Sequence, residues 1–290
     1  MSATHPLARE PVAAPEARRH PTLVDATRWE LSKLSAQLRG RIALLLCLLA
    51  PVLVVIVVHG QGRPPKDTLF GRYVHDSGYA VPLLVLGFAT QWLLPLLTAI
   101  VAGDIFASED QHGTWKTVLT RSASRAQVFW AKTLTATLFA LTALVVLAAS
   151  TIVSSVLLVG HQDLVGLTGQ VIPSGRAAGL VIASWATAAA PLIGFTCLAI
   201  LLSIRTRNPA FGIAAPVVLG MIMTLVGGLG GVEAIRPLLL TTPFESWHGL
   251  LAQDQFFSPL TTGLVVSAVW AIACLAAAFI SLRRADITEG

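Results

Sequence analysis

The residues that could carry chemistry are few, and their spacing builds no familiar catalytic or metal site. Cys47, Cys197 and Cys274 each lie inside an apolar run, and the chain has no Cys-x-x-Cys pair or His/Cys cluster. A zinc site or a disulfide framework needs such spacing, so we expect three buried, apolar thiols. His248 has no second histidine or carboxylate at a matching spacing, and we interpret it as a packing residue. We therefore expect no catalytic residue and no metal ligand.

Lysine positions decide whether the chain could hold a nucleotide. A phosphate-binding loop needs a lysine that directly follows glycine, in the pattern Gly-x4-Gly-Lys-Ser/Thr. None of the four lysines, at positions 33, 66, 116 and 132, follows a glycine. The chain is therefore not expected to be an enzyme that hydrolyses ATP.

The composition is that of an integral membrane protein. Hydrophobic residues make up 54% of the 290 positions and charged residues only 12%, about half the charged share of a soluble domain. The formal net charge of +5 could suggest nucleic acid. The positive charges, however, gather in short polar segments between apolar runs, which is how membrane proteins set their orientation. No nucleic-acid partner is expected.

Six apolar stretches have about the length that a spanning helix needs. They are residues 42–58, 79–103, 133–159, 177–203, 210–228 and 257–282, and none of them contains Asp, Glu, Lys or Arg. The first is short, and Gly40 and Arg41 would let a preceding helix continue into it. The predicted fold class is all-α integral membrane, with six transmembrane helices.

The distribution of Lys and Arg orients these spans. Fifteen of the 20 basic residues fall on one side and five on the other, which places both termini in the cytoplasm. Residues 1–21 hold four prolines and no apolar core, so we expect a disordered cytoplasmic tail and no secretory signal. We expect an amphipathic connecting helix at 22–41, the six-helix transmembrane domain at 42–285 and a short cytoplasmic tail at 286–290.

The polar segment after the second span, residues 103–132, shows two helix starts. Ser108 to Gln111 has the form of a capping box, with Glu109 and Asp110 in the first turn, where the helix dipole favours negative charge. A second capping box, Ser124 to Gln127, opens the helix that enters the membrane after Lys132. The alternative is an ordinary solvated connector whose charges only fix topology.

This segment resembles the intracellular loop of ABC-2 type transporter permeases, the membrane subunits of ATP-binding cassette exporters. The matching residues are Glu109, Gly113-Thr114, Val118-Leu119, Ser124-Arg125 and Lys132. The chain departs from the pattern at Gln111, at Ser122, where the family has a proline, and at Ala131, where it has a glycine. The resemblance extends more diffusely over residues 22 to 285.

The resemblance implies a transport subunit without its own motor. In the family this loop contains a coupling helix that docks on an ATPase subunit. The coupling residues implied here are Trp29, Glu109, Asp110, Gly113, Thr114, Trp115 and Arg125. Glu109 and Asp110, exposed in a first turn, would pair with a basic rim of the ATPase. Two permease copies, as a homodimer, would work with two ATPase copies that bind ATP and Mg. Apolar pathway walls would suit an amphipathic drug, natural product or lipid, and family behaviour implies its export across a bacterial plasma membrane.

Residues 27–41 indicate the connecting helix. Thr27 and Glu30 have capping-box spacing, and Leu31, Leu34 and Leu38 continue from Thr27 as a narrow apolar stripe of helical period. Basic residues on the other faces favour contact with the lipids of the inner leaflet. Trp29 lies opposite the stripe, where it would reach the ATPase or anchor the helix at the membrane interface.

On the outer side, a short helix before the last span is predicted from an N-cap at Thr242, a proline and then Glu245. Its apolar face is expected to lie half-sunk in the membrane. That face comprises Phe244, Trp247, His248 and Leu251. Within the spans, the candidates for a substrate pathway are Gln91, Met221 and Met223, with an interhelical hydrogen bond as the alternative role of Gln91.

Three other functions are possible for a membrane protein of this composition. A proton-driven secondary transporter needs titratable groups inside the membrane, and the six apolar stretches contain no Asp, Glu, Lys or Arg. An intramembrane enzyme needs a nucleophile and base or a metal cluster at that depth, and the span interiors contain no histidine. A structural membrane protein remains open, because the loop argument relies partly on family resemblance.

Overall fold

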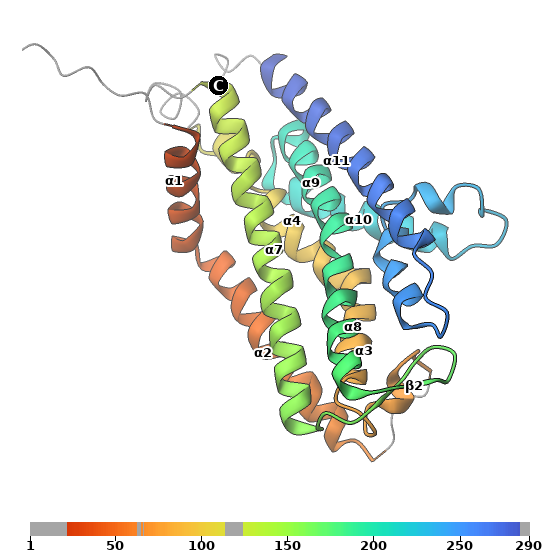
Figure 1. Ribbon diagram of the computed structural model, residues 1–290. Coiled ribbons are helices and arrows are strands. Elements are labelled where there is room, and N and C mark those ends of the chain that lie inside the picture. The colour runs from red at the N-terminus through yellow and green to blue at the C-terminus, as the bar shows by residue number, and fades with distance from the viewer. Residues whose placement is uncertain (1–21, 63–64, 66, 114–123, 285–290) are drawn as a thin grey trace, which may run out of the picture.

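The described residues form a helical bundle (Figure 1). The computed structural model describes residues 22–62, 65, 67–113 and 124–284. Six helical stretches within them are long and apolar enough to cross a membrane, as predicted. The chain is thus an all-α integral membrane protein, and the predicted tails at 1–21 and 286–290 lie outside the described residues.

The elements follow one another along the chain with short connections. The first half comprises α1 (Leu23–Ala36), α2 (Leu38–Gly60), η1 (Gly71–Tyr73), α3 (Ala80–Phe88), η2 (Ala89–Leu93), α4 (Leu94–Ala102), α5 (Ala107–Gln111) and α7 (Arg125–Leu158). The second half comprises β1 (Leu164–Val165), β2 (Val171–Ile172), α8 (Ser174–Thr187), α9 (Ala189–Thr206), α10 (Pro209–Gly227), η3 (Arg236–Leu238), η4 (Thr242–Leu251) and α11 (Ser258–Arg284). Strands β1 and β2 form an antiparallel ribbon.

Two spans are interrupted next to a proline. In the second span, α3 and α4 are joined by η2, a π-helical turn that ends two residues before Pro95. In the fourth span, α8 and α9 meet at Ala188, three residues before Pro191. Proline has no backbone N–H and its ring crowds the carbonyl four residues earlier, so the regular helix cannot continue unchanged.

The connecting helix begins near the predicted position 22, but its N-cap differs from the predicted one. Thr22 is its N-cap, forming a capping box with Asp25, so the predicted capping box of Thr27 and Glu30 is wrong. Thr27 instead lies inside α1 and donates its hydroxyl to the carbonyl of Leu23. Helix α1 ends at Ala36, and the extended residue Gln37 separates it from α2, which begins at Leu38. Gly40 and Arg41 lie inside α2, so a helix does continue through them into the first span, as expected, although this helix is separate from α1.

Helix α9 occupies the centre of the bundle, packing against α4, α7, α10 and α11. Helices α10 and α11 are far more exposed, as is α2. At the junction of the second and fifth spans, Gly103 and Gly212 approach so closely that a Cβ on either would collide with the other's carbonyl oxygen. Small residues permit such tight helix contacts in membranes.

The two ends of the bundle differ in content. Figure 1 shows α1 and the end of α11 at one end, and η1 and the β ribbon at the other. By the distribution of basic residues, the first is the cytoplasmic end. Helix α7 has 34 residues, or roughly 50 Å at 1.5 Å per residue, which exceeds the hydrocarbon thickness of about 30 Å. It therefore extends from the membrane region into the cytoplasmic end.

Candidate functional site

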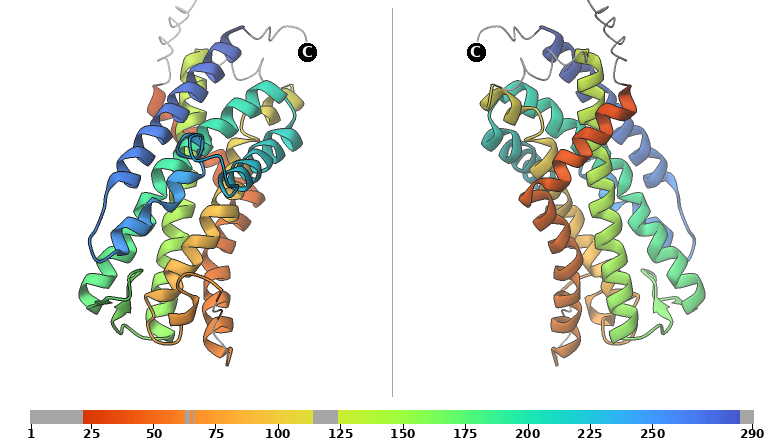
Figure 2. Two further views of the ribbon diagram at one scale, coloured as in Figure 1. Left: turned by 90° about the vertical axis from the view of Figure 1, so that its right-hand side faces the viewer. Right: turned by 90° about the vertical axis from the view of Figure 1, so that its left-hand side faces the viewer.

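Three helices from separate parts of the chain meet at the cytoplasmic end. Helix α1 packs along the first part of α7, as the right view in Figure 2 shows. Helix α5 follows α4 after a short turn and contacts α9 and α10. This arrangement brings the connecting helix, the described part of the loop and the third span together.

A buried ion network joins these three helices. Lys132 on α7 lies 2.9 Å from Oε1 of Glu109 on α5 and 3.1 Å from Oε1 of Glu30 on α1. Lys33, also on α1, donates to the same Glu109 oxygen at 2.5 Å. The side chain of Lys132 is only 1% exposed and that of Glu109 only 3%, whereas Lys33 is 40% exposed. Two carboxylates thus face two ammonium groups, and the network carries no net charge.

An ion pair and a hydroxyl group support this network. Arg39, in the first turn of α2, pairs with the buried carboxylate of Asp104, which follows α4 directly. The hydroxyl oxygen of Ser203 on α9 accepts the backbone N–H groups of Phe106 and Ala107 at 3.2 and 3.0 Å. Because free N–H groups at a helix start need acceptors, Ser203 holds the start of α5 against the central helix.

The predicted exposure of Glu109 is wrong. We expected Glu109 and Asp110 in an exposed first turn, free to meet a basic partner surface. Glu109 is buried and its carboxylate binds Lys33 and Lys132 of its own chain, while Asp110 is half-buried. The predicted capping box at Ser108 is also wrong, since α5 begins at Ala107 after Phe106.

The other predicted coupling residues lie around this network or outside the description. Trp29 on α1 is 50% exposed, and Gly113 is exposed with a φ of 61°, which favours glycine. Arg125 is half-buried at the start of α7, where the predicted capping box of Ser124 and Gln127 is confirmed. Thr114 and Trp115 lie outside the described residues.

Sequence reasoning missed Lys132 and Glu30 as partners, although a signal existed. Lys132 shares one helical face with buried apolar residues at spacings of −4, −3, +4 and +7. These are Val128, Phe129, Ala136 and Phe139. A lysine on an apolar stripe must reach a counter-charge or water, so its position alone predicted a buried partner.

A second polar region lies at the π-helical turn in the middle of the second span. Gln91 is exposed there, and no hydrogen bond of its side chain is found among the described residues. Met221 on α10 is 44% exposed, whereas Met223 is half-buried and packs on the main hydrophobic core. The π-turn exposes Gln91 at membrane depth, and such turns occur often at functional sites.

The predicted short helix before the last span exists, but its apolar face does not meet the membrane. Helix η4 is a 3₁₀ helix packed against α8, α9 and α11. Phe244, Trp247 and Leu251 are at most 2% exposed and belong to the main core, and only His248 is half-buried. The expectation of a face half-sunk in lipid is therefore wrong, because neighbouring spans of the protein cover it.

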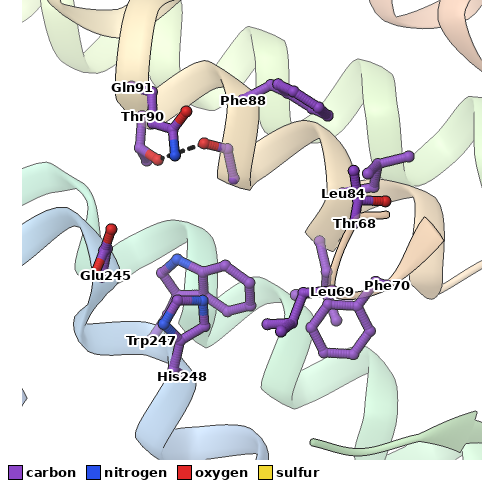
Figure 3. Close-up of a pocket in the computed structure, with 12 residues that line it drawn as sticks. Thr68, Leu69, Phe70, Leu84, Phe88, Thr90, Gln91, Glu245, Trp247 and His248 are labelled. Atoms are coloured by element: carbon purple, nitrogen blue, oxygen red, sulfur yellow. Dashed lines mark hydrogen bonds between the residues drawn. The ribbon is translucent and has the colours of Figure 1, made fainter. Parts of the chain in front are cut away.

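Two adjoining cavities lie between η4 and the π-turn. Figure 3 shows the residues that line the first of them. Their volumes are about 280 and 380 Å³, and they share three lining residues, Thr90, Gln91 and Glu245. Glu245 and His248 both line the first cavity, so a carboxylate does lie near this histidine. Glu245 is exposed and His248 is half-buried, and partial shielding from water raises the pKa of Glu245 and lowers that of His248.

The three cysteines are buried and unpaired, as expected. Within the described ranges, no group of three His, Cys, Asp or Glu side chains is placed to hold a metal ion.

Comparison with known proteins identifies the family. The model of the ABC-2 family transporter proteins matches residues 27–227, which is more than half of the chain. The search of curated proteins found no match to the chain. The match includes α1 from Thr27 onward, the first five spans and the described part of the loop. The chain therefore belongs to the ABC-2 family of transporter proteins and is a multi-pass membrane permease component of an ABC transporter.

Proposed function

We propose that a separate ATPase drives this permease by pressing on α1 and on the loop at 103–132. The buried network of Glu30, Lys33, Glu109 and Lys132 carries this proposal, because it joins the loop and the connecting helix to a membrane span. ATP and Mg would bind to the ATPase.

The network explains how a displacement at the surface could reach the membrane. Moving α5 alone would separate the buried carboxylate of Glu109 from both Lys33 and Lys132, at a cost of about 3–5 kcal/mol. Moving α5 together with α1 and α7 avoids that cost. The three helices should therefore shift as a rigid unit when the ATPase subunits close, and α7 passes the motion to the spans.

The docking surface should consist of exposed groups around this network, with Glu109 acting inside it. Trp29 offers an exposed aromatic anchor on α1. In the loop, Asp110 is half-buried in α5, and Gly113, just after α5, is exposed. Aromatic anchors contribute strongly to protein interfaces. Thr114, Trp115 and Arg125 complete the proposed contact region.

The substrate pathway is proposed to lie between two copies of the chain. An exposed amide at membrane depth is costly in lipid, and Gln91 is exposed halfway along the second span. Trp92 on the second span and Met221 on the fifth span are also exposed. A second permease copy would cover this face, with two ATPase subunits below. The proposed activity is export of an amphipathic drug, natural product or lipid from a bacterium.

Co-purification with the ATPase tests the docking assignment. The chain is expressed with its cognate ATPase, and the variant Trp29→Ala/Asp110→Ala should bind it at least about tenfold more weakly. Asp76→Ala, which removes an exposed carboxylate near η1 at the outer end, is the matched control and should bind normally. Unchanged binding by the double variant would show that the ATPase docks elsewhere.

A further inference from the structure

The two cavities beside η4 form one site with two chemically different parts. The first part is lined mainly by apolar groups, among them Leu69, Phe70, Phe88 and Trp247. The second is lined by Thr224, Arg236, Thr241, Thr242 and the shared polar residues. We call the two parts together the outer cavity. Its division suits a molecule with an apolar body and a polar end.

Glu245 occupies the junction of the two parts. Figure 3 shows its carboxylate on η4 across the cavity from Thr90 and Gln91. Among the described residues it accepts no hydrogen bond and forms no ion pair. The residue is exposed; partial shielding from water raises its pKa, and the charge of Arg236 acts in the opposite direction. The guanidinium of Arg236 lines only the second part and donates to the carbonyl of Leu229 at 3.3 Å.

We propose that the outer cavity binds amphipathic organic cations, with the protonated amine beside Glu245 and the apolar body between Phe70, Phe88 and Trp247. The proposal that these cations are substrates rests on the proposed transport function. The proposal that the outer cavity binds them depends only on its lining residues.

Charge and ring chemistry favour a cation over an anion or a neutral compound. The carboxylate of Glu245 has no ion-pair partner among the described residues, and an ammonium group beside it would gain Coulomb attraction that an anion or a neutral group would not. The ring of Trp247, whose centroid lies 4.1 Å from that of the tilted His248 ring, adds an aromatic wall to which cations are attracted. Arg236 lines only the second part together with Glu245, so the amine should bind on the side of Glu245 that faces the apolar part, where Arg236 is not among the lining residues.

Binding without the ATPase tests this inference separately from transport. The full chain is reconstituted in lipid nanodiscs and titrated with two fluorescent probes that share one naphthyl group and one alkyl chain. One probe ends in a primary amine and the other in the N-acetylated amide, which has no charge. At pH 7.5 the amine should bind about tenfold more tightly than the amide.

Substitution of the carboxylate should remove this preference. In Glu245→Gln, which keeps the side-chain shape, the two probes should bind within about twofold of each other. Glu233→Gln removes an exposed carboxylate from the same outer segment but from neither cavity, and should keep the wild-type preference. Glu245→Asp, as a second variant, should keep part of the preference.

Equal binding of the two probes by the wild type would overturn the inference. So would an amine preference that survives in Glu245→Gln, or one that is lost equally in Glu233→Gln. Normal amine binding without any ATP-dependent transport would support the cavity assignment and refute only the proposed function.

Discussion

Replacing Lys132 by methionine should destabilise the protein strongly. Methionine keeps much of the volume but removes the ammonium group that lies within 3.1 Å of both Glu30 and Glu109. Glu109 would still bind Lys33, while Glu30, 5% exposed, would be left as a buried charge without a partner. Breaking a buried pair in this way costs about 3–5 kcal/mol.

Two further variants set the scale of that effect. Lys33→Met removes a side chain that is 40% exposed, from a Glu109 that still has Lys132, so about 1 kcal/mol or less is expected. Glu30→Gln/Lys132→Met removes one charge of each sign and leaves the Lys33–Glu109 pair intact. Its cost should fall below the sum of the two single changes by about 1–3 kcal/mol.

The free energy of unfolding is measured by reversible SDS denaturation of the detergent-solubilised protein, followed by tryptophan fluorescence. The reasoning fails if Lys132→Met lies within about 1 kcal/mol of the wild type. It also fails if the costs of Glu30→Gln and Lys132→Met simply add, because the two side chains would then not interact.

Three further outcomes are expected. Gly212→Ala should cost more than about 1 kcal/mol through collision with a facing carbonyl, whereas Gly179→Ala, with open space around it, should be neutral or slightly stabilising in the same unfolding assay. Ser124→Ala should cost about 1 kcal/mol, because α7 loses its N-cap bond; no loss would contradict that geometry. Binding of the amine probe should weaken as pH falls through the range from below 6.5 to above 4.5, since Glu245 becomes neutral and His248 becomes positive. Glu245→Gln should remove the larger part of that pH dependence and His248→Gln the smaller, and tighter binding at low pH would refute both roles.

Local patterns in the sequence were sufficient to predict the helices, but not to predict which distant residues their side chains contact. The apolar runs predicted six spans, and Ser124 with Gln127 predicted the start of α7. The network could not be found in this way, because Lys132 is 102 positions from Glu30. The first turn of α5 looked exposed for the same reason: a capping pattern says nothing about which distant side chains cover Glu109.

The short helix η4 shows a similar limit. The spacing of Phe244, Trp247 and Leu251 correctly indicated one apolar face, but periodicity cannot say whether lipid or protein covers that face. The π-turn at Gln91 depends on Pro95 in the middle of a span, where a kink, a break or a wider turn would each relieve the proline. Glu245 entered the sequence reasoning only as a capping residue, and its place in a cavity depends on tertiary packing.

The energy source for transport is the most direct test of the account. Proteoliposomes containing the chain, with or without its cognate ATPase, are loaded with ATP and the amine probe or with the probe alone, and probe movement is followed. We predict movement only when the ATPase and ATP are both present, and its loss when ATP is replaced by a non-hydrolysable analogue. Movement driven by a proton gradient, or by the chain without the ATPase, would contradict the account.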